Sequence, residues 1–351
     1  MSRKVKIFLG AYSNIINAQN LNCLAIAKNL DKSKFDITIL SLYSGSEIEI
    51  KGVNIFKCYW PHKILVYWAY FWNIVKSDVV YLPKAELLGF NSFLCKFFKK
   101  KSFSTIEGIL SKNSTESMIS KGGKNFAKYF NRYSKLYSIT SFIKNYNYIN
   151  HQLKTENEVL LLGTESENFL NTKPSNIKLN KLIMIGNDLM LKGVDDLFEL
   201  AKLFSNLEFH IVGSGNDKID VNKEIQRNNL KNTFYHGLIS QEELANLLQN
   251  MQLHIFPSRS EGFPKVILET ACAGIPSIVY DDYGANQWID HNQNGFVVKN
   301  IHEIKLVIED LLNNKIKLDQ ISINATKLGI SYDWKLKIKR WEDVILNLSS
   351  D

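Results

Sequence analysis

The 351-residue sequence contains few of the residues that build disulfide scaffolds, long linkers or membrane spans. It has four cysteines and no Cys-x-x-Cys pair, so we expect neither a disulfide framework nor a zinc ribbon, and this usage fits a reducing cytoplasm. Six prolines and no tract rich in Ser and Gly exclude a long flexible linker. No uncharged apolar stretch reaches the roughly 18 residues that span a bilayer, and the N-terminal apolar run is too short for a signal peptide. A cytoplasmic protein is therefore expected.

Arginine is also scarce, at five of the 43 basic residues. The positive charge is distributed unevenly between the two halves of the chain. Residues 1–170 carry 23 Lys and Arg against 12 Asp and Glu, whereas residues 171–351 carry 20 against 23. Coding bias toward lysine accounts for some basicity but not for its concentration in one half, which favours an anionic surface as a partner. Nucleic acid is not expected, because arginine is rare and no zinc, helix-turn-helix or RNP-like motif is present.

Continuous apolar segments alternate with helical patterns along both halves of the chain, which predicts parallel sheets covered on both faces. The fold class is therefore α/β, with two Rossmann-like doubly wound domains that face a cleft. We predict domains at residues 1–172 and 173–330, joined by the polar stretch Asn171–Asn176, and a C-terminal helix at 331–351 that crosses back to the N-terminal domain. The strands are expected at Val5–Gly10, Phe35–Leu42, Val53–Cys58, Asp78–Leu82, Phe103–Ile106, Glu158–Leu162, Leu182–Ile185, Leu207–Val212, Asn232–His236, Leu253–Pro257, Ser277–Tyr280 and Gly295–Val298.

The most informative motif is SRSEGFPKVILE, residues 258–269, where a strand ends and a helix begins near Pro264. Proline suits the first helical position, and the helix N-terminus offers N–H groups and a positive dipole end to a diphosphate. Glu261 and Glu269 are separated by about two helical turns, too far to share a proton, so they are expected to serve different parts of an elongated ligand. For an arbitrary pair of this kind, exposed loop and helix positions are the ordinary interpretation.

Two further segments follow predicted strands. In GNDLMLKG, residues 186–193, Lys192 stands at a strand-to-helix junction, where a lysine can reach a phosphate as a mobile point charge. Gly213 belongs to the glycine turn Val212–Gly215. Each of these, taken alone, is a common surface feature.

Together these segments resemble the retaining GT-B glycosyltransferases of group 1 (family 4), which use nucleotide sugars to make bacterial surface polysaccharides and glycolipids. The resemblance is strong over residues 182–300, where GNDLMLKG, HIVGSGND, FYHGLISQEEL, the Glu-x7-Glu spacing, ACAGIPSIV and NGFVV occur in the family's order. Over the first 180 residues it rests on the strand–helix rhythm and on LLLGTESENF.

The resemblance implies a catalytic pair, Glu261 beside the donor sugar and Lys192 on the diphosphate. It places the ribose hydroxyls on Glu269 and the base along the backbone of Leu238 and Ile239. Gly213 is expected on the donor side, and sugar and phosphate are expected along the backbone of Gly262, Phe263, Pro264, Lys265 and Val266. The expected donor is a UDP- or GDP-sugar, and no other cofactor is expected.

Three positions depart from the family pattern. Asn187 replaces the usual arginine after the first glycine of GNDLMLKG, so Arg259 or a nearby lysine is expected to replace that cation. Glu107 follows the strand after which the family often has a histidine, and the loop with Tyr12 and Ser13 lacks the usual double glycine. Glu107, Tyr12 and Ser13 are the acceptor-side candidates. No Asp-x-Asp and no histidines at metal-binding spacing occur, so the implied mechanism needs no metal. The resemblance implies that the acceptor hydroxyl attacks with retention of the anomeric configuration. It also implies that the leaving phosphate serves as the base.

Two aromatic runs stand out in the basic half. Lys63–Lys76 contains Tyr67, Trp68, Tyr70, Phe71 and Trp72, and Leu87–Lys101 contains four phenylalanines before three consecutive lysines. Either these rings belong to the core, or they anchor the protein peripherally on the anionic inner face of the cell membrane.

The expected activity is transfer of a sugar from the nucleotide donor to a glycan or lipid-linked acceptor in surface polysaccharide assembly. One rival is a sugar-nucleotide 2-epimerase of similar fold, which the Glu-x7-Glu motif opposes. The other is a non-catalytic partner of another transferase that keeps the fold.

Overall fold

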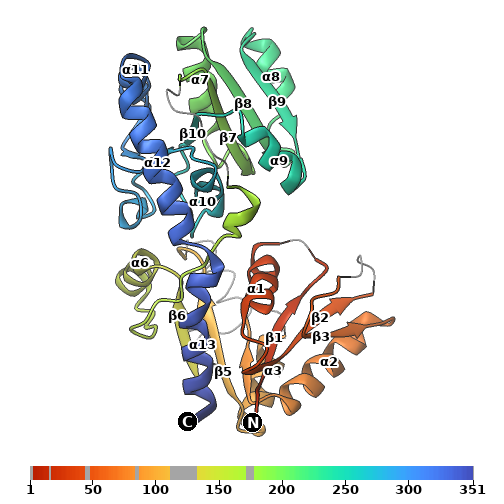
Figure 1. The fold of residues 1–351 in the computed structure, drawn as a ribbon. Helices are drawn as coiled ribbons and strands as arrows, with labels where there is room; N and C mark the ends of the chain where they lie inside the picture. The colour runs from red at the N-terminus through yellow and green to blue at the C-terminus, as the bar shows by residue number, and fades with distance from the viewer. Residues whose placement is uncertain are drawn as a thin grey trace. The chain divides into compact units, whose positions relative to one another are not determined.

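The computed structural model describes residues 3–15, 17–43, 48–83, 87–110, 133–170 and 178–350. Their contacts divide the chain into two compact units (Figure 1). The first unit comprises Met1–Leu162 together with Trp334–Asp351, and the second comprises Gly163–Asp333. Each unit contains a six-stranded parallel sheet.

The sheet of the first unit has the strand order β3-β2-β1-β4-β5-β6. Alternate residues of β1 point to opposite faces, and Phe8 and Tyr12 join a core cluster with residues of α2 and α3. Helices α1 and α13 both contact β1, and α13 also contacts β4. The elements are β1 (Val5–Tyr12), α1 (Ala18–Asn29), β2 (Phe35–Leu42), β3 (Val53–Cys58), α2 (His62–Lys76), β4 (Val79–Tyr81), α3 (Leu88–Phe97), β5 (Lys101–Ile106), β6 (Lys135–Ser138), α6 (Ser141–His151) and α13 (Trp334–Ser350).

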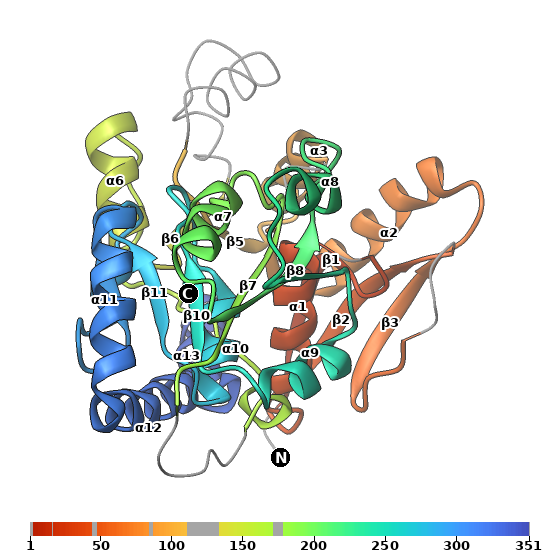
Figure 2. The same cartoon turned by 90° about the horizontal axis from the view of Figure 1, so that it is seen from above.

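The C-terminal helix α13 belongs to the first unit, as the sequence predicted. Trp341 is fully buried, lies 5.5 Å from the Tyr81 ring of β4, and donates a hydrogen bond to the carbonyl of Leu161 at 3.0 Å. Arg340 forms an ion pair with Glu158 at 2.6 Å. This helix therefore completes the covering of the first sheet (Figure 2).

The sheet of the second unit has the order β12-β11-β10-β7-β8-β9. In β7, Leu182 and Met184 enter one core cluster, and Ile183 and Ile185 enter another, so both faces of the sheet are covered. The elements are η1 (Ser166–Asn168), β7 (Lys181–Asn187), α7 (Val194–Leu203), β8 (Glu208–Ser214), α8 (Val221–Arg227), β9 (Thr233–Gly237), α9 (Gln241–Leu248), β10 (Leu253–Phe256), α10 (Lys265–Cys272), β11 (Ser277–Tyr280), η2 (Ala285–Gln287), β12 (Phe296–Val298), α11 (Ile301–Asn313) and α12 (Lys315–Ser331).

The α/β class with two Rossmann-like sheets is confirmed, and all but one of the predicted strands form within two residues of their expected ends. The exception is Glu158–Leu162, of which only Val159 forms an isolated bridge, to Ser138. The sixth strand of the first sheet is instead β6, which lacks a long apolar run.

The boundary between the units lies between Leu162 and Gly163, ten residues before the predicted division. The reason is local packing: Thr164 bridges to Asp333, and Phe169 is buried in the core of the second unit. The predicted linker Asn171–Asn176 lies outside the described residues. Within the described residues, none of the helices is long and apolar enough to cross a membrane.

Candidate active site

The second unit brings two of the predicted residues into direct contact at the carboxyl edge of its sheet. The Lys192 Nζ donates to Glu261 Oε1 at 2.5 Å, and the Ser258 Oγ donates to the same oxygen at 2.6 Å. The Lys192 and Glu261 side chains are only 21% and 10% exposed, so solvent screens this pair weakly. No other described residue donates to the Glu261 carboxylate, which keeps acceptor capacity for a ligand hydroxyl.

Two glycines allow the strand ends and the loops at this edge to approach one another. Gly193 has φ +82°, and a Cβ there would lie 2.6 Å from the Pro257 carbonyl oxygen. Gly213 has φ +136°, and a Cβ there would lie 1.7 Å from the Gly186 carbonyl oxygen. Because only glycine fits both constraints, the ends of β7 and β8 approach closely and the loops after β7 and β10 meet, where Lys192 reaches Glu261.

A second ion pair at this edge was not predicted. Lys218, from the loop after β8, pairs with Asp188, from the loop after β7. The hydrogen bond from Lys218 is the main reason that the pKa of Asp188 lies below its usual range, and the charge of Lys192 lowers it further. Two lysines thus flank one carboxylate beside Asn187. Lys218 lies 26 residues beyond Lys192, and no motif marked it.

Helix α10 begins at Lys265, as predicted, but Pro264 occupies the N-cap position and not the first helical position. Glu261 therefore lies in the preceding loop, and only Glu269 is helical. Burial raises the pKa of Glu269 from its ordinary value to about 6, although the charge of Lys265 opposes this shift. Such a carboxyl group is poised to change protonation near neutral pH, as ligand-binding carboxylates often are.

The remaining donor-side candidates occupy different surroundings. The Arg259 guanidinium lies 3.6 Å from Asp282 and 4.8 Å from the centre of the Tyr280 ring. Leu238 is exposed, at the end of β9, whereas Ile239 packs against the core. Phe263 is buried against Trp288, so its side chain is structural and only its backbone is available to a ligand. Gly262, Lys265 and Val266 are partly buried around the start of α10.

The acceptor-side candidates lie at the carboxyl edge of the first sheet. Glu107, after β5, accepts hydrogen bonds from Asn22 at 2.9 Å and from Thr105 at 3.3 Å. Tyr12 and Ser13 are buried at the end of β1. The Ser13 Oγ and the Asn22 Oδ1 are buried and have no hydrogen-bond partner among the described residues. Buried polar atoms without partners mark sites where a ligand can supply the missing bond.

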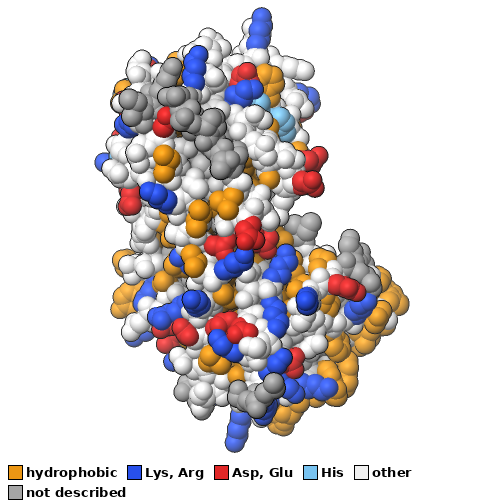
Figure 3. Space-filling model, viewed as in Figure 1, with side chains coloured by type: hydrophobic (Ala, Val, Ile, Leu, Met, Phe, Trp, Pro, Cys, Tyr) orange, Lys and Arg blue, Asp and Glu red, His pale blue; other side chains and the backbone are white. Residues whose placement is uncertain are grey.

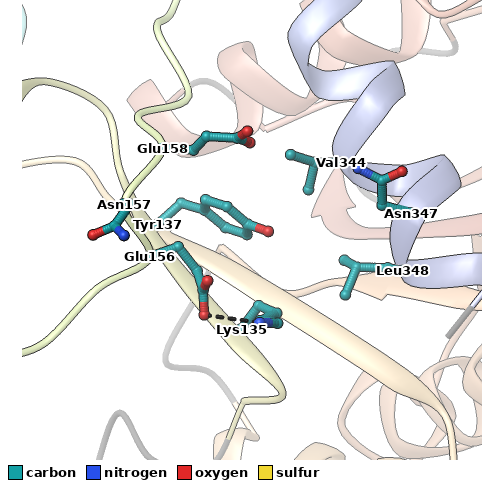
Figure 4. Close-up of a pocket in the computed structure, with 8 residues that line it drawn as sticks. All are labelled: Lys135, Tyr137, Glu156, Asn157, Glu158, Val344, Asn347 and Leu348. Carbon is teal, nitrogen blue, oxygen red and sulfur yellow. Dashed lines mark ion pairs between the residues drawn. The ribbon is translucent and has the colours of Figure 1, made fainter.

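A pocket of about 260 Å³ lies elsewhere in the first unit, between β6 and α13. Figure 4 shows Tyr137 pointing into it, with Val344 and Leu348 on the opposite wall and Lys135 paired with Glu156 at 3.2 Å. Lys135 begins β6, so this pocket adjoins the amino edge of the sheet. Ligands of such sheets bind at the carboxyl edge, and the pocket holds none of the predicted residues.

In the described part of the chain, no group of three or more His, Cys, Asp or Glu side chains is arranged to hold a metal ion. The four cysteines are free and buried.

The chain resembles known glycosyltransferases in sequence and in fold. Residues 165–328 match the model of the family "Glycosyl transferases group 1". An uncharacterized glycosyltransferase of Methanocaldococcus jannaschii is 26% identical over 75% of this chain and 74% of its own length. The N,N'-diacetylbacillosaminyl-diphospho-undecaprenol alpha-1,3-N-acetylgalactosaminyltransferase of Campylobacter jejuni is 26% identical over 47% of this chain and 45% of its own.

The same fold occurs in solved structures. HepE of Anabaena, in complex with UDP-glucose, superimposes with a TM-score of 0.78 at 16% identity, over 97% of this chain and 99% of that one. The fold and the matched family define the class of this protein: it is a glycosyltransferase with the GT-B fold. The match to the group 1 glycosyltransferases covers residues 165–328, a little less than half of the chain.

Proposed function

We propose that this glycosyltransferase moves a sugar from a nucleoside diphosphate donor to a hydroxyl of a glycan or lipid-linked acceptor, with retention of the anomeric configuration. The observation that carries the proposal is the cluster of Lys192, Glu261 and Ser258 at the carboxyl edge of a sheet whose segment matches the family. The UDP-glucose complex of the structurally similar HepE supports a UDP-sugar donor. A GDP-sugar is the other donor to test.

In this proposal the second unit binds the donor. Glu261 accepts a hydrogen bond from the sugar, Glu269 holds the ribose hydroxyls, and Leu238 and Ile239 frame the base. Gly213 and the backbone from Gly262 to Val266 line the sugar and phosphates.

The leaving diphosphate carries growing negative charge as the glycosidic bond breaks. Lys192 and the N-terminus of α10 stabilise that charge without a metal ion. Lys218 replaces the cation that Asn187 lacks, because it already lies beside the same loop, held by Asp188. Arg259 remains a second candidate for this role, although it is exposed and faces Asp282. The leaving phosphate itself takes the acceptor's proton.

On the acceptor side, Glu107, Tyr12 and Ser13 bind the incoming hydroxyl compound at the edge of the first sheet. The undecaprenol-linked substrate in the name of the Campylobacter relative supports a lipid-linked acceptor. The poly(ribitol-phosphate) named for a Staphylococcus aureus relative, 25% identical over 49% of this chain, supports a surface polymer instead. A lipid-linked acceptor would place the protein peripherally on the inner face of the membrane.

Turnover of a panel of UDP- and GDP-sugars, with and without lipid-linked and polyol-phosphate acceptors, tests the proposal. Acceptor-dependent release of the nucleoside diphosphate, with an α-linked product from an α-linked donor by NMR, is expected, and it should persist in a metal chelator. Isomerised or hydrolysed donor without any acceptor would establish the epimerase alternative. No turnover, combined with capture of another transferase, would establish the non-catalytic one.

A further inference from the structure

Helix α2 has two apolar faces, and only one of them packs into the protein. Val66, Tyr70 and Ile74 are buried against the first sheet. On the other side, Ile64, Trp68 and Trp72 follow one another at intervals of four residues, which places them along one stripe of the helix. The sequence left open whether this aromatic run was core or surface, and the structure shows that it is both.

Helix α3 extends the exposed stripe. Phe93 and Phe97 are 61% and 68% exposed, and their rings stack at 5.8 Å. The two helices are joined by ring contacts, since Phe97 meets Phe98 at 5.0 Å and Phe98 meets Phe71 at 5.9 Å. Phe71 in turn stacks on Trp68 at 5.5 Å. We call this continuous surface the α2–α3 face: Ile64, Trp68, Phe71, Trp72, Phe93, Phe97 and Phe98.

The exposed apolar area of the α2–α3 face can be estimated from the exposure of its rings. Trp68 and Trp72 are 51% and 37% exposed, so with roughly 150–250 Å² per aromatic side chain the four most exposed rings present roughly 300–550 Å². The largest apolar patch of a soluble monomer has about this size and is often functional. Figure 3 shows hydrophobic side chains gathered over the region that α2 occupies in Figure 1, with Lys and Arg nearby.

The two helices of this face carry charge of one sign, and the acidic residue beside them is Asp36, which lines a pocket with Trp72 and Lys76. Neither α2 nor α3 contains Asp or Glu. Lys76 continues the α2 stripe, with its Nζ 4.1 Å from the centre of the Trp72 ring, and Lys96 and Lys99 are exposed at the end of α3. Among the described residues, none of these three lysines forms an ion pair. A twofold contact between two copies of this face would bring lysines against lysines, so a second copy fits it poorly.

We infer that the α2–α3 face docks on an anionic lipid bilayer, with the aromatic rings in the interface and the lysines on the headgroups. Exposed apolar side chains beside basic ones bind such surfaces in this way. The inference deepens the proposed function, because a lipid-linked acceptor is found at that surface, but docking itself requires no donor.

The test is cosedimentation of the full chain with vesicles of phosphatidylcholine alone or with about 30% phosphatidylglycerol. Anionic vesicles should bind at least about tenfold more protein, and about 1 M salt should release most but not all of it. Trp68→Ser combined with Phe97→Ser should abolish the salt-resistant fraction. Lys76→Gln combined with Lys96→Gln should lower binding to anionic vesicles alone.

Matched controls lie outside the face. Tyr148→Ser with Phe234→Ser removes two other exposed rings, and Lys202→Gln with Lys231→Gln removes two other exposed lysines. Both should bind vesicles like the parent protein. Equal, negligible binding of the parent to both vesicles would overturn the inference, and so would controls that lose as much binding as the face variants.

Two further measurements separate this inference from the proposed function. UDP affinity, measured in solution by calorimetry, should be the same in the face variants and the parent, which also shows that they are folded. If UDP fails to bind the parent while vesicles do, the donor proposal fails and the docking inference stands. Concentration-dependent dimerisation that the Trp68→Ser/Phe97→Ser variant loses would assign the face to a second copy and overturn it.

Discussion

Basic side chains are arranged differently in the two units. At the carboxyl edge of the second sheet, Lys192 and Lys218 each contact an acidic residue, Glu261 and Asp188. In the first unit, the lysines around the α2–α3 face have aromatic neighbours and no acidic residue within their helices. Cations held by carboxylates are positioned before a ligand arrives, whereas cations among exposed rings suit a broad anionic surface. The difference explains why similar folds are expected to recognise a compact diphosphate in one unit and a lipid surface in the other.

The first way to break this comparison is to remove the Glu261 carboxylate from the cluster of Lys192, Glu261 and Ser258. Glu261→Gln should lower kcat by about 100-fold, because a group that stabilises the transition state typically contributes that much, while UDP affinity changes little. Steady-state kinetics with saturating donor measure it. Glu242→Gln, on the surface of α9, is the matched control and should be silent; a kcat within twofold of the parent for Glu261→Gln would remove Glu261 from catalysis.

The second concerns the lysine of the same cluster. Lys192→Ala should weaken UDP binding by about 1.5–3 kcal/mol, or about 10- to 150-fold, because a charged hydrogen bond to phosphate is lost. Uridine, which has no phosphate, should bind equally to the variant and the parent in calorimetry. Lys202→Ala is the control. An equal loss for UDP and uridine would show that the substitution disturbs the fold and not a phosphate contact.

The third uses the raised pKa of Glu269. UDP affinity should fall as the pH drops through about 6, because protonation weakens the acceptor of the ribose hydroxyls. Glu269→Gln should bind several-fold more weakly at pH 7.5, a value about 1.5 units above that pKa, and should lose the part of the pH dependence that Glu269 adds to the titration of the UDP phosphate.

The effect of Glu269 on the free energy of unfolding has the opposite pH dependence. Because the folded pKa is above the unfolded one, Glu269 contributes stability at low pH that is lost as the pH rises through about 6. Thermal unfolding of ligand-free Glu269→Gln should lack this loss, which amounts to at most about 2 kcal/mol. A pH profile identical to that of the parent would contradict the burial of this carboxyl group.

The fourth sharpens the assignment of Lys218. Lys218→Ala should weaken UDP binding by about three- to tenfold, less than Lys192→Ala, because Lys218 is half exposed and screened by solvent. Adding Asn187→Arg to Lys218→Ala should restore affinity, since the arginine would occupy the neighbouring loop. Failure of that rescue, with Arg259→Ala weakening binding instead, would transfer the role to Arg259.

The fifth and smallest effect is expected in the first unit. Glu107→Gln should raise the KM for the acceptor by about three- to fivefold, the loss of one modest hydrogen bond, and leave the KM for the donor unchanged. Glu156→Gln, at the amino edge of the same sheet, is the control. A change in donor KM alone would contradict the division of labour between the units.

The sequence determined the α/β class and most strand positions, because strands buried on both faces require long apolar runs wherever they occur. It missed β6, whose four residues include a lysine and a serine. It predicted a strand at Glu158–Leu162, where Val159 forms only an isolated bridge and the Leu161 carbonyl accepts a hydrogen bond from Trp341 of α13. Lys192, Glu261 and Glu269 were also candidates from the sequence, through the resemblance of their motifs to those of the group 1 glycosyltransferases. Their roles stay predictions until the variants are measured.

Only the tertiary structure decided which residues join those motifs and which face of α2 meets solvent. Lys218 and Asp188 are 30 residues apart and meet because parallel strands end at the same edge of the sheet, which no local pattern records. Helix α2 is apolar on both sides, so its periodicity could not say which stripe would pack. Tyr70 and Ile74 are buried because they pack into the core cluster against the first sheet. Trp68 and Trp72 remain exposed because nothing in the described chain covers them.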